Sequence, residues 1–167
     1  MSDLYTELIV KRKKTAADTV KKALLIAGTV VGVLAFFTMG IIGLVILVAF
    51  GVADYFLLPT FDVEYEYIYV NGELDVDKIM SKQKRKRVYS MDTKKLELMA
   101  PSNSHVLDYH NQNKNLKTLD FSSGEEGAKT FTMIVKGEKG MEKVIFEPND
   151  VIVKDMKRIA PREVNLM

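Results

Sequence analysis

Hydrophobic and polar positions divide the chain into two parts with different patterns. Residues 23–53 contain no charged side chain, and apolar residues continue past Asp54. From Phe61 onward, apolar and polar residues alternate in short runs that are separated by turn residues. The first pattern is typical of membrane-spanning helices and the second of β-strands. The sequence therefore predicts a membrane anchor over residues 23–58, followed by a mostly β domain over residues 60–161.

The length of the apolar segment favours two helices over one. A single helix from Ala23 to Leu58 would be roughly 54 Å long, whereas the hydrocarbon core of a bilayer is about 30 Å thick. The natural break is Thr38-Met39-Gly40, because glycine tolerates the positive φ that a tight turn between helices needs. We therefore expect a hairpin with helices near Ala23–Thr38 and Gly40–Leu58. A single span that exports the domain is the alternative.

Charge placement also favours the hairpin. Basic residues flank the apolar segment on both sides: Lys11, Arg12, Lys13, Lys14, Lys21 and Lys22 before it, and Lys82, Lys84, Arg85, Lys86 and Arg87 after it. Basic flanks remain on the cytoplasmic side, and a hairpin places both clusters there. The apolar run is too long for a cleaved signal peptide. The expected location is thus the cytoplasmic membrane, multi-pass, with the soluble domain in the cytoplasm.

The first 22 residues are interpreted as a basic flank that sets the topology. Leu4, Leu8 and Ile9 recur at helical spacing, so a short amphipathic helix on the membrane surface is the alternative.

The β domain begins with a clear hairpin. FDVEYEYIYV alternates with period two, so that Tyr65, Tyr67 and Tyr69 share one face, and Asn71-Gly72 is the strongest short hairpin signal. We interpret the tyrosine stripe as core packing. KRVYS and KKLELMAP read as further strands, residues 102–115 as including a polar loop, and TFTMIV and MEKVIF as a second hairpin around the turn of residues 136–140.

A C-terminal amphipathic helix is predicted after Asn149, which is a plausible N-cap. Ile152, Met156 and Ile159 form its apolar stripe, and Pro161 ends it, which leaves residues 162–167 as a tail. The fold class is therefore a helical membrane hairpin plus an α+β domain, with an antiparallel β-barrel or sheet that is capped by the C-terminal helix. This is the plan of a pleckstrin-homology (PH)-like domain.

Three stretches carry a resemblance to a known group. YEYIYVNGELDVDKI, KRKRVYSM and VIFEPNDVIVKDMKRIAP resemble a group of small bacterial membrane proteins, and the likeness extends over most of the chain. The soluble part of these proteins is similar to bacterial PH-like domains, which often follow a membrane hairpin. The resemblance implies a bacterial origin, a cytoplasmic membrane location and a PH-like fold, and it implies no catalytic or ligand-binding residue.

The sequence contains little that predicts catalysis. It has no cysteine, which excludes disulfides and thiolate chemistry. His105 and His110 are five residues apart in a polar stretch, a spacing that does not match the H-E-x-x-H zinc motif. Asp54 could be an intramembrane carboxylate, but its position favours the headgroup region. We therefore predict no enzymatic activity, no metal site and no cofactor.

The candidate binding site is the basic cluster Lys82, Lys84, Arg85, Lys86 and Arg87. Five cations beside a membrane anchor could contact anionic lipid headgroups, or an acidic surface of an unknown membrane or cytosolic protein. Aromatic residues do not interleave these cations, and the net charge is only +2, so nucleic acid is not expected as a partner. A solvated connection between strands is the structural alternative. The predicted function is a membrane-tethered scaffold or interaction module, and the alternative is an anionic-lipid sensor.

Overall fold

The computed structural model describes residues 4–113, 116–137 and 140–166. The chain forms two compact units. One unit contains residues 13–63 and 79–84, and it is mainly helical. The other contains residues 1–12, 64–78 and 85–167, and it carries most of both β-sheets.

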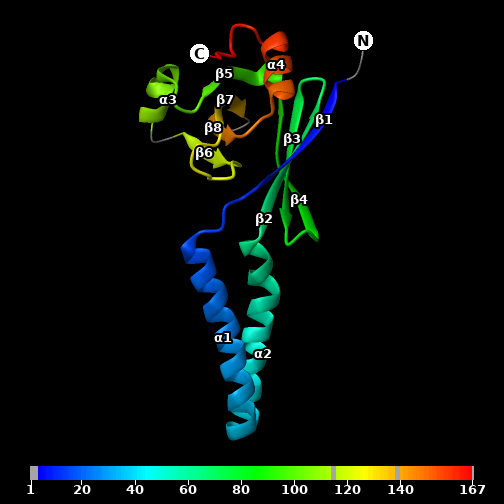
Figure 1. Ribbon diagram of the computed structural model, residues 1–167, viewed down its shortest axis with the longest axis vertical. Coiled ribbons are helices and arrows are strands. Elements are labelled where there is room, and N and C mark those ends of the chain that lie inside the picture. The colour runs from blue at the N-terminus through cyan, green and yellow to red at the C-terminus, as the bar shows by residue number, and fades with distance from the viewer. Residues whose placement is uncertain (1–3, 114–115, 138–139, 167) are drawn as a thin grey trace. The chain divides into compact units, whose positions relative to one another are not determined.

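The helical unit is an antiparallel hairpin, as the sequence predicts (Figure 1). Helix α1 spans Ala16–Met39, helix α2 spans Ile41–Leu57, and the 3₁₀ helix η1 follows at Leu58–Phe61. Gly40 separates α1 from α2 with a φ of 59°, a left-handed conformation that side chains larger than hydrogen disfavour. Thr15 and Asp18 form a capping box at the start of α1. The predicted break at Gly40 is confirmed, whereas α1 begins seven residues before the predicted Ala23.

Glycines allow α1 and α2 to pack closely. A Cβ placed on Gly43 would lie 2.1 Å from the backbone carbon of Ala35, and one on Gly32 would lie 2.9 Å from the Cα of Leu47. A Cβ on Gly28 would overlap the ring of Phe50. Close approach at small residues is the main way in which helices associate in lipid. A Cβ on Gly51, which also lies in α2, would meet nothing within 4 Å, so this glycine does not contribute to the contact.

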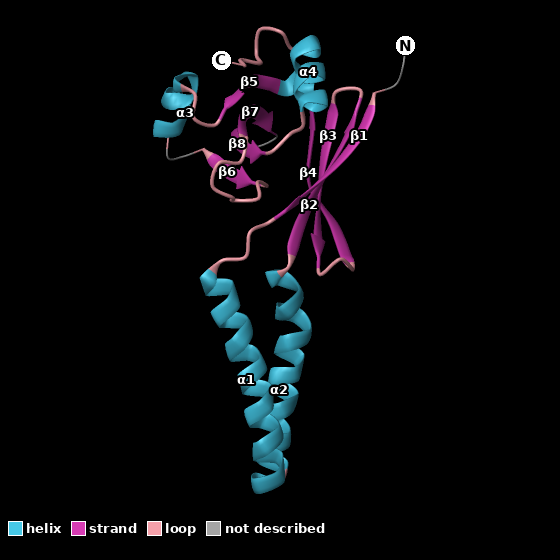
Figure 2. Ribbon diagram, in the orientation of Figure 1, coloured by secondary structure: helices cyan, strands magenta, loops and turns pink. Residues whose placement is uncertain are grey.

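The first sheet has four strands in the order β1-β2-β3-β4: Tyr5–Lys11, Val63–Val70, Glu73–Met80 and Lys84–Asp92 (Figure 2). Strand β1 is antiparallel to β2, with Tyr5 opposite Val70 and Lys11 opposite Glu64. The alternative of a short amphipathic helix is therefore wrong for residues 5–11, and the predicted basic flank contains a strand. The segment adopts a strand because β2 offers a free edge and because Val10 becomes buried opposite Tyr65.

The tyrosine stripe forms the core of this sheet, as predicted. Tyr67 and Tyr69 are fully buried, and Tyr65 is nearly so. The hydroxyl of Tyr67 donates to the carbonyl of Phe121 at 2.8 Å, and its ring packs edge-on against Phe146. Positive φ angles at Asn71 and Gly72 confirm the predicted turn between β2 and β3.

The second sheet has the order β5-β7-β8-β6: Leu96–Pro101, Phe131–Gly137, Gly140–Phe146 and Lys117–Asp120. Strand β6 is parallel to β8, while the other pairs are antiparallel. The predicted strands and the second hairpin are confirmed, although turn residues 138 and 139 lie outside the described residues. The sequence did not indicate β6.

Short helical turns connect these strands: η2 at Thr93–Lys95, η3 at His105–Leu107 and α3 at Asp108–Gln112. The stretch predicted to include a polar loop therefore folds into η3 and α3 over much of its described length. Leu107 holds it in place, because its fully buried side chain joins Ala100 and Ile134 in one apolar cluster.

The C-terminal helix α4 spans Asp150–Ile159 and begins at Asn149, whose side chain accepts a hydrogen bond from the backbone N–H of Ile152 at 3.0 Å. Both the helix and its N-cap are as predicted. The residues after the helix are ordered through Val164, which bridges Met99 of β5 in parallel. Of the predicted tail, only Met167 lies outside the described residues.

The chain thus contains an α+β domain with a C-terminal helix and, as a separate unit, a helical hairpin, as expected. Of the two alternatives, barrel or sheet, the described residues form two open sheets and no closed barrel.

Candidate functional site

Both helices of the hairpin are long and apolar enough to cross a membrane, judged by length and composition. Only 6% of each apolar span is buried within the described protein, whereas the core helix of a soluble fold is mostly buried. Large side chains such as Phe37, Ile41 and Leu24 are 79%, 77% and 66% exposed. A contiguous apolar surface of this kind requires a covering partner or a bilayer.

The open end of the hairpin carries basic and aromatic side chains. Because the helices are antiparallel, the start of α1 and the end of α2 lie at the same end (Figure 1). Lys14 precedes α1 and forms an ion pair of 3.2 Å with Asp62, which follows η1. Tyr55 and Phe56 are exposed near the end of α2. Aromatic and basic residues gather in this way at membrane interfaces.

The turn between β3 and β4 belongs to the same compact unit as the hairpin. Ser81 donates its backbone N–H to the carbonyl of Asp62 at 2.8 Å. Lys82 follows with a φ of 57° and an exposed side chain. The ammonium of Lys84 lies 4.7 Å from the ring centre of Tyr55, a cation–π distance. Two lysines of the predicted basic cluster therefore lie at the open end of the hairpin.

A small cavity of about 340 Å³ lies at this open end. Its walls include Lys14, Lys22, Thr19 and Ser81, together with the carboxylates of Asp18 and Asp62. The two positive and two negative charges balance, so the cavity by itself has no preference for an anion.

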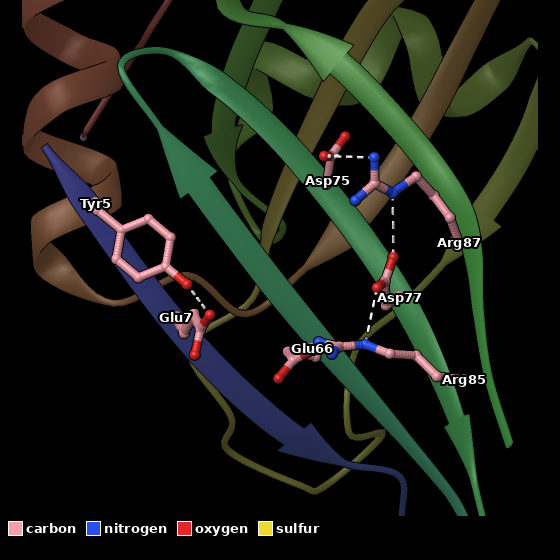
Figure 3. A network of polar contacts seen from close by, with 7 residues as sticks. All are labelled: Tyr5, Glu7, Glu66, Asp75, Asp77, Arg85 and Arg87. Carbon is pink, nitrogen blue, oxygen red and sulfur yellow. Dashed lines mark hydrogen bonds and ion pairs between the residues drawn. The ribbon is translucent and has the colours of Figure 1, made fainter. Parts of the chain in front are cut away.

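The arginines of the predicted cluster have a different role. Arg85 contacts the carboxylates of Glu66 and Asp77, and its Nε lies 2.9 Å from Asp77 Oδ2 (Figure 3). Arg87 binds Asp75 at 2.9 Å and Asp77 at 3.2 Å. Glu66 and Asp77 are each only 7% exposed. The two arginines therefore pair with carboxylates on one face of the first sheet.

The predicted cluster therefore separates into two groups. Lys82, Lys84 and Lys86 have exposed side chains and no carboxylate partner among the described residues, whereas Arg85 and Arg87 are held in ion pairs across β2, β3 and β4. The sequence did contain a signal for this difference, since Glu66, Asp75 and Asp77 alternate on the neighbouring strands. Whether these carboxylates lie on the same face as the arginines depends on the order of the strands in the sheet, which the sequence does not show.

Asp54 is held within the helical hairpin. Its Oδ2 accepts a hydrogen bond of 2.6 Å from the hydroxyl of Thr29 on α1, and its Oδ1 is buried with no hydrogen-bond partner among the described residues. The sequence predicted that Asp54 lies in the headgroup region, and it did not predict this contact between the helices. Sequence alone could not find the pair, because it depends on the rotation of each helix about its axis.

The histidines show no sign of a metal site. His105 Nδ1 lies 3.3 Å from Asp108 Oδ2 on an exposed turn, and His110 lies on α3. Within the described ranges, no group of three or more histidine, cysteine or acidic side chains could hold a metal ion.

These features define a protein with two apolar helices at its N-terminus and an α+β domain of two open sheets with a C-terminal helix. Residues 2–166 match the family described as Bacterial PH-like domain (DUF6106), so the chain belongs to this family. Comparisons with curated proteins and with solved structures found no match.

Proposed function

We propose that this protein is a membrane-tethered scaffold or interaction module, with its PH-like domain in the cytoplasm close to the inner leaflet. The observation that carries this proposal is the pairing of β1 with β2. These strands flank the hairpin in the sequence and are hydrogen-bonded neighbours in one sheet. Both must therefore lie on the same side of any membrane that the helices cross.

The same argument opposes the single-span alternative. One span between Lys11 and Glu64 would place these residues on opposite membrane faces, although they are Cα partners in the β1–β2 ladder. Two spans return the chain to its starting side. With η1 included, the second apolar helix runs over Ile41–Phe61, 21 residues, which is close to the length needed for one span.

The cytoplasmic side is supported by the lysines at the open end of the hairpin. Lys13, Lys14, Lys21 and Lys22 lie just before or within the first turns of α1, whereas the turn around Gly40 carries no charge. Positive flanks are retained in the cytoplasm. The proposal assigns no enzymatic activity to the domain.

Single-cysteine labelling tests this topology, because the chain has no cysteine of its own. Ile41→Cys lies beside the hairpin turn, and Glu125→Cys lies on an exposed loop of the domain. In spheroplasts of a bacterial host, an impermeant maleimide should label Ile41→Cys at once and Glu125→Cys only after lysis. Labelling of Glu125→Cys in intact spheroplasts would show an exported domain and overturn the proposal.

A second candidate function is the sensing of anionic lipid. It is supported by Lys82 and Lys84 at the open end of the hairpin and by the exposed Lys86. Each cation near an anionic leaflet contributes about 1 kcal/mol, within a Debye length of about 8 Å at physiological salt. The tether already supplies localisation, so the lysines would orient the domain rather than recruit it. The partner, whether lipid or an acidic protein, would be recognised by charge.

The lipid test requires the full chain, because a fragment that begins at residue 60 lacks β1 and leaves one edge of β2 without its partner strand. We would label Lys82→Cys with a fluorophore in nanodiscs and measure quenching by headgroup-labelled lipid. Quenching should be stronger in nanodiscs with phosphatidylglycerol than in pure phosphatidylcholine, and added salt should remove the difference. Equal quenching in both lipids at low salt would refute the lipid proposal and leave the protein-partner proposal.

A further inference from the structure

An apolar groove of about 470 Å³ lies between α1 and α2 at the open end of the hairpin. All of its lining residues belong to the helical unit. Its walls are mainly large apolar side chains: Leu24, Leu25, Phe50, Leu57 and Phe61. The groove is separate from the predicted basic cluster, whose residues do not line it. Its volume and its apolar walls are typical of small-molecule sites.

The contacts between α1 and α2 place the two sides of this groove opposite each other. Gly43 meets the backbone of Ala35, and Gly28, seven residues before Ala35, meets the ring of Phe50, seven residues after Gly43. Residues seven apart lie on one face of a helix, two turns from each other. A further seven residues along each helix therefore bring Lys21 level with Leu57, on the faces that α1 and α2 turn towards each other. Both residues line the groove.

The groove forms where the close contact between the helices ends. Gly32 and Gly43 let the backbones meet near the turn, and at Gly28 the ring of Phe50 occupies the space between the helices. From Ala16 to Ala27, α1 has no glycine. The helices therefore separate towards the open end of the hairpin (Figure 1), and side chains alone form the walls there.

The groove has two polar side chains, and only one of them is available to a ligand. The hydroxyl of Thr60 donates to the carbonyl of Leu57 at 2.6 Å. Lys21 has an exposed side chain and no hydrogen-bond or ion-pair partner among the described residues. Lys21 lies two residues before the uncharged segment that begins at Ala23. A lysine near the end of a membrane helix extends its ammonium to the headgroup region.

We propose that this groove binds one acyl chain of an anionic phospholipid, with the lipid phosphate at the ammonium of Lys21. The proposal rests on the membrane-spanning hairpin proposed above. The acyl chain would follow the groove from Lys21 towards Phe50, a length of about 10 Å along the helix axis. An anionic phospholipid fits better than phosphatidylcholine, because the choline cation of the latter opposes the charge of Lys21.

The shape of the groove favours a lipid over a helix from a second copy of the chain. Helices associate in lipid mainly through small residues that let their backbones approach. The walls here are leucine and phenylalanine, and Gly28, Gly32 and Gly43 are already used between α1 and α2. A flexible acyl chain can adapt to bulky, uneven walls.

Tryptophan quenching by brominated lipid tests the site in the full chain, which has no tryptophan of its own. Leu24→Trp places the fluorophore at the groove, and Ile26→Trp places it on an exposed part of α1 outside the groove. Nanodiscs would contain dibrominated phosphatidylcholine with an equal amount of unbrominated phosphatidylglycerol or phosphatidylcholine. At Leu24→Trp, phosphatidylglycerol should displace the brominated lipid with a preference of about fivefold and reduce quenching. At Ile26→Trp, quenching should depend only on the brominated fraction.

The outcomes separate the groove from the membrane topology. Equal lipid preference at the two tryptophans would show general attraction to the basic end of the hairpin and overturn the groove proposal alone. Much weaker quenching at Leu24→Trp than at Ile26→Trp in every mixture would show that protein, such as a second copy, covers the groove. An absence of quenching at both positions would show that the helices do not lie in the bilayer, and both proposals would fall.

A matched pair of variants tests the role of Lys21. In the Leu24→Trp protein, Lys21→Gln should remove the preference for phosphatidylglycerol. The control is Lys22→Gln, which removes the same charge from the next residue, outside the groove, and should retain most of the preference. Since both lysines are exposed, both variants should fold. Equal loss in the two variants would reject Lys21 as the phosphate contact.

Discussion

Lys11 and Glu64 are Cα partners in the β1–β2 ladder, although the whole helical hairpin lies between them in the sequence. The chain segments that enter and leave the hairpin are therefore neighbouring strands of one sheet. The N-terminal strand is therefore a part of the PH-like domain, and the apolar helical hairpin is an insertion between the first two strands of that domain.

The role of β1 predicts effects of different size on stability for substitutions at two neighbouring residues. Val10 is buried opposite Tyr65, whereas Ile9 is 56% exposed. Val10→Ala should lower the free energy of unfolding by about 1–2 kcal/mol, because it removes buried methyl groups from the sheet. Ile9→Ala should change it by less than about 0.5 kcal/mol. Urea unfolding of the full chain in detergent measures both, and equal effects would contradict the strand.

The contact between Thr29 and Asp54 predicts coupling between the two helices. A double-mutant cycle with Thr29→Val and Asp54→Leu should give an interaction energy of about 0.6–1.7 kcal/mol, the range found for hydrogen bonds between membrane helices. Asp54→Asn, which keeps an acceptor oxygen, should retain most of it. Thermal unfolding in detergent provides the measurement. Strict additivity of the two single substitutions would show that the hydrogen bond contributes nothing.

The basic cluster should separate into two phenotypes. Arg85→Gln with Arg87→Gln leaves the buried carboxylates of Glu66 and Asp77 without cations. We expect a loss of about 1–3 kcal/mol in unfolding free energy, reduced from the value for fully buried pairs because both arginines are half exposed.

The matched control is Lys82→Gln with Lys84→Gln, which removes the same charge from exposed positions that have no carboxylate partner among the described residues. It should leave the urea midpoint nearly unchanged. With a fluorophore on Lys86→Cys as the reporter in nanodiscs, it should also reduce the difference in quenching between membranes with and without phosphatidylglycerol. If the lysine variant is destabilised as much as the arginine variant, the division of the cluster is wrong.

Alkaline pH should destabilise the domain through its tyrosines. Burial, with a smaller contribution from Glu142, raises the pKa of Tyr89 to about 12, and burial also raises the pKa values of Tyr65, Tyr67 and Tyr69. The reference pKa is about 10, so the unfolded chain releases phenolic protons at lower pH than the folded chain. The stabilising contribution is complete below about pH 10 and is lost as the pH rises through about 12.

The measurement is the urea midpoint between pH 9 and pH 11. We expect stability to fall by about 1 kcal/mol or more. Lysines also titrate in this range, so Tyr89→Phe is the control: its stability should fall less steeply than that of the wild type. An identical pH dependence for the two proteins would show that Tyr89 ionises equally in the folded and unfolded states.

Much of this protein could be predicted from local sequence alone. The uncharged segment and Gly40 indicated two helices, the alternating tyrosines indicated a buried strand face, and Asn149 marked the start of α4. Each of these features depends on residues that are close in the sequence, so periodicity and turn chemistry determine it. The family resemblance then indicated a PH-like domain.

Tertiary structure decided the features that join distant residues. Residues 5–11 have few intrinsic signals, and they form a strand because β2 supplies hydrogen-bond partners and a buried face. The four-residue β6 is likewise defined by its pairing with β8. Arg85 and Lys84 are adjacent in the sequence, yet one side chain meets buried carboxylates while the other lies over Tyr55. Strand order and side-chain alternation determine that difference, and neither can be read from composition, because both arise only when the separate strands assemble into a sheet.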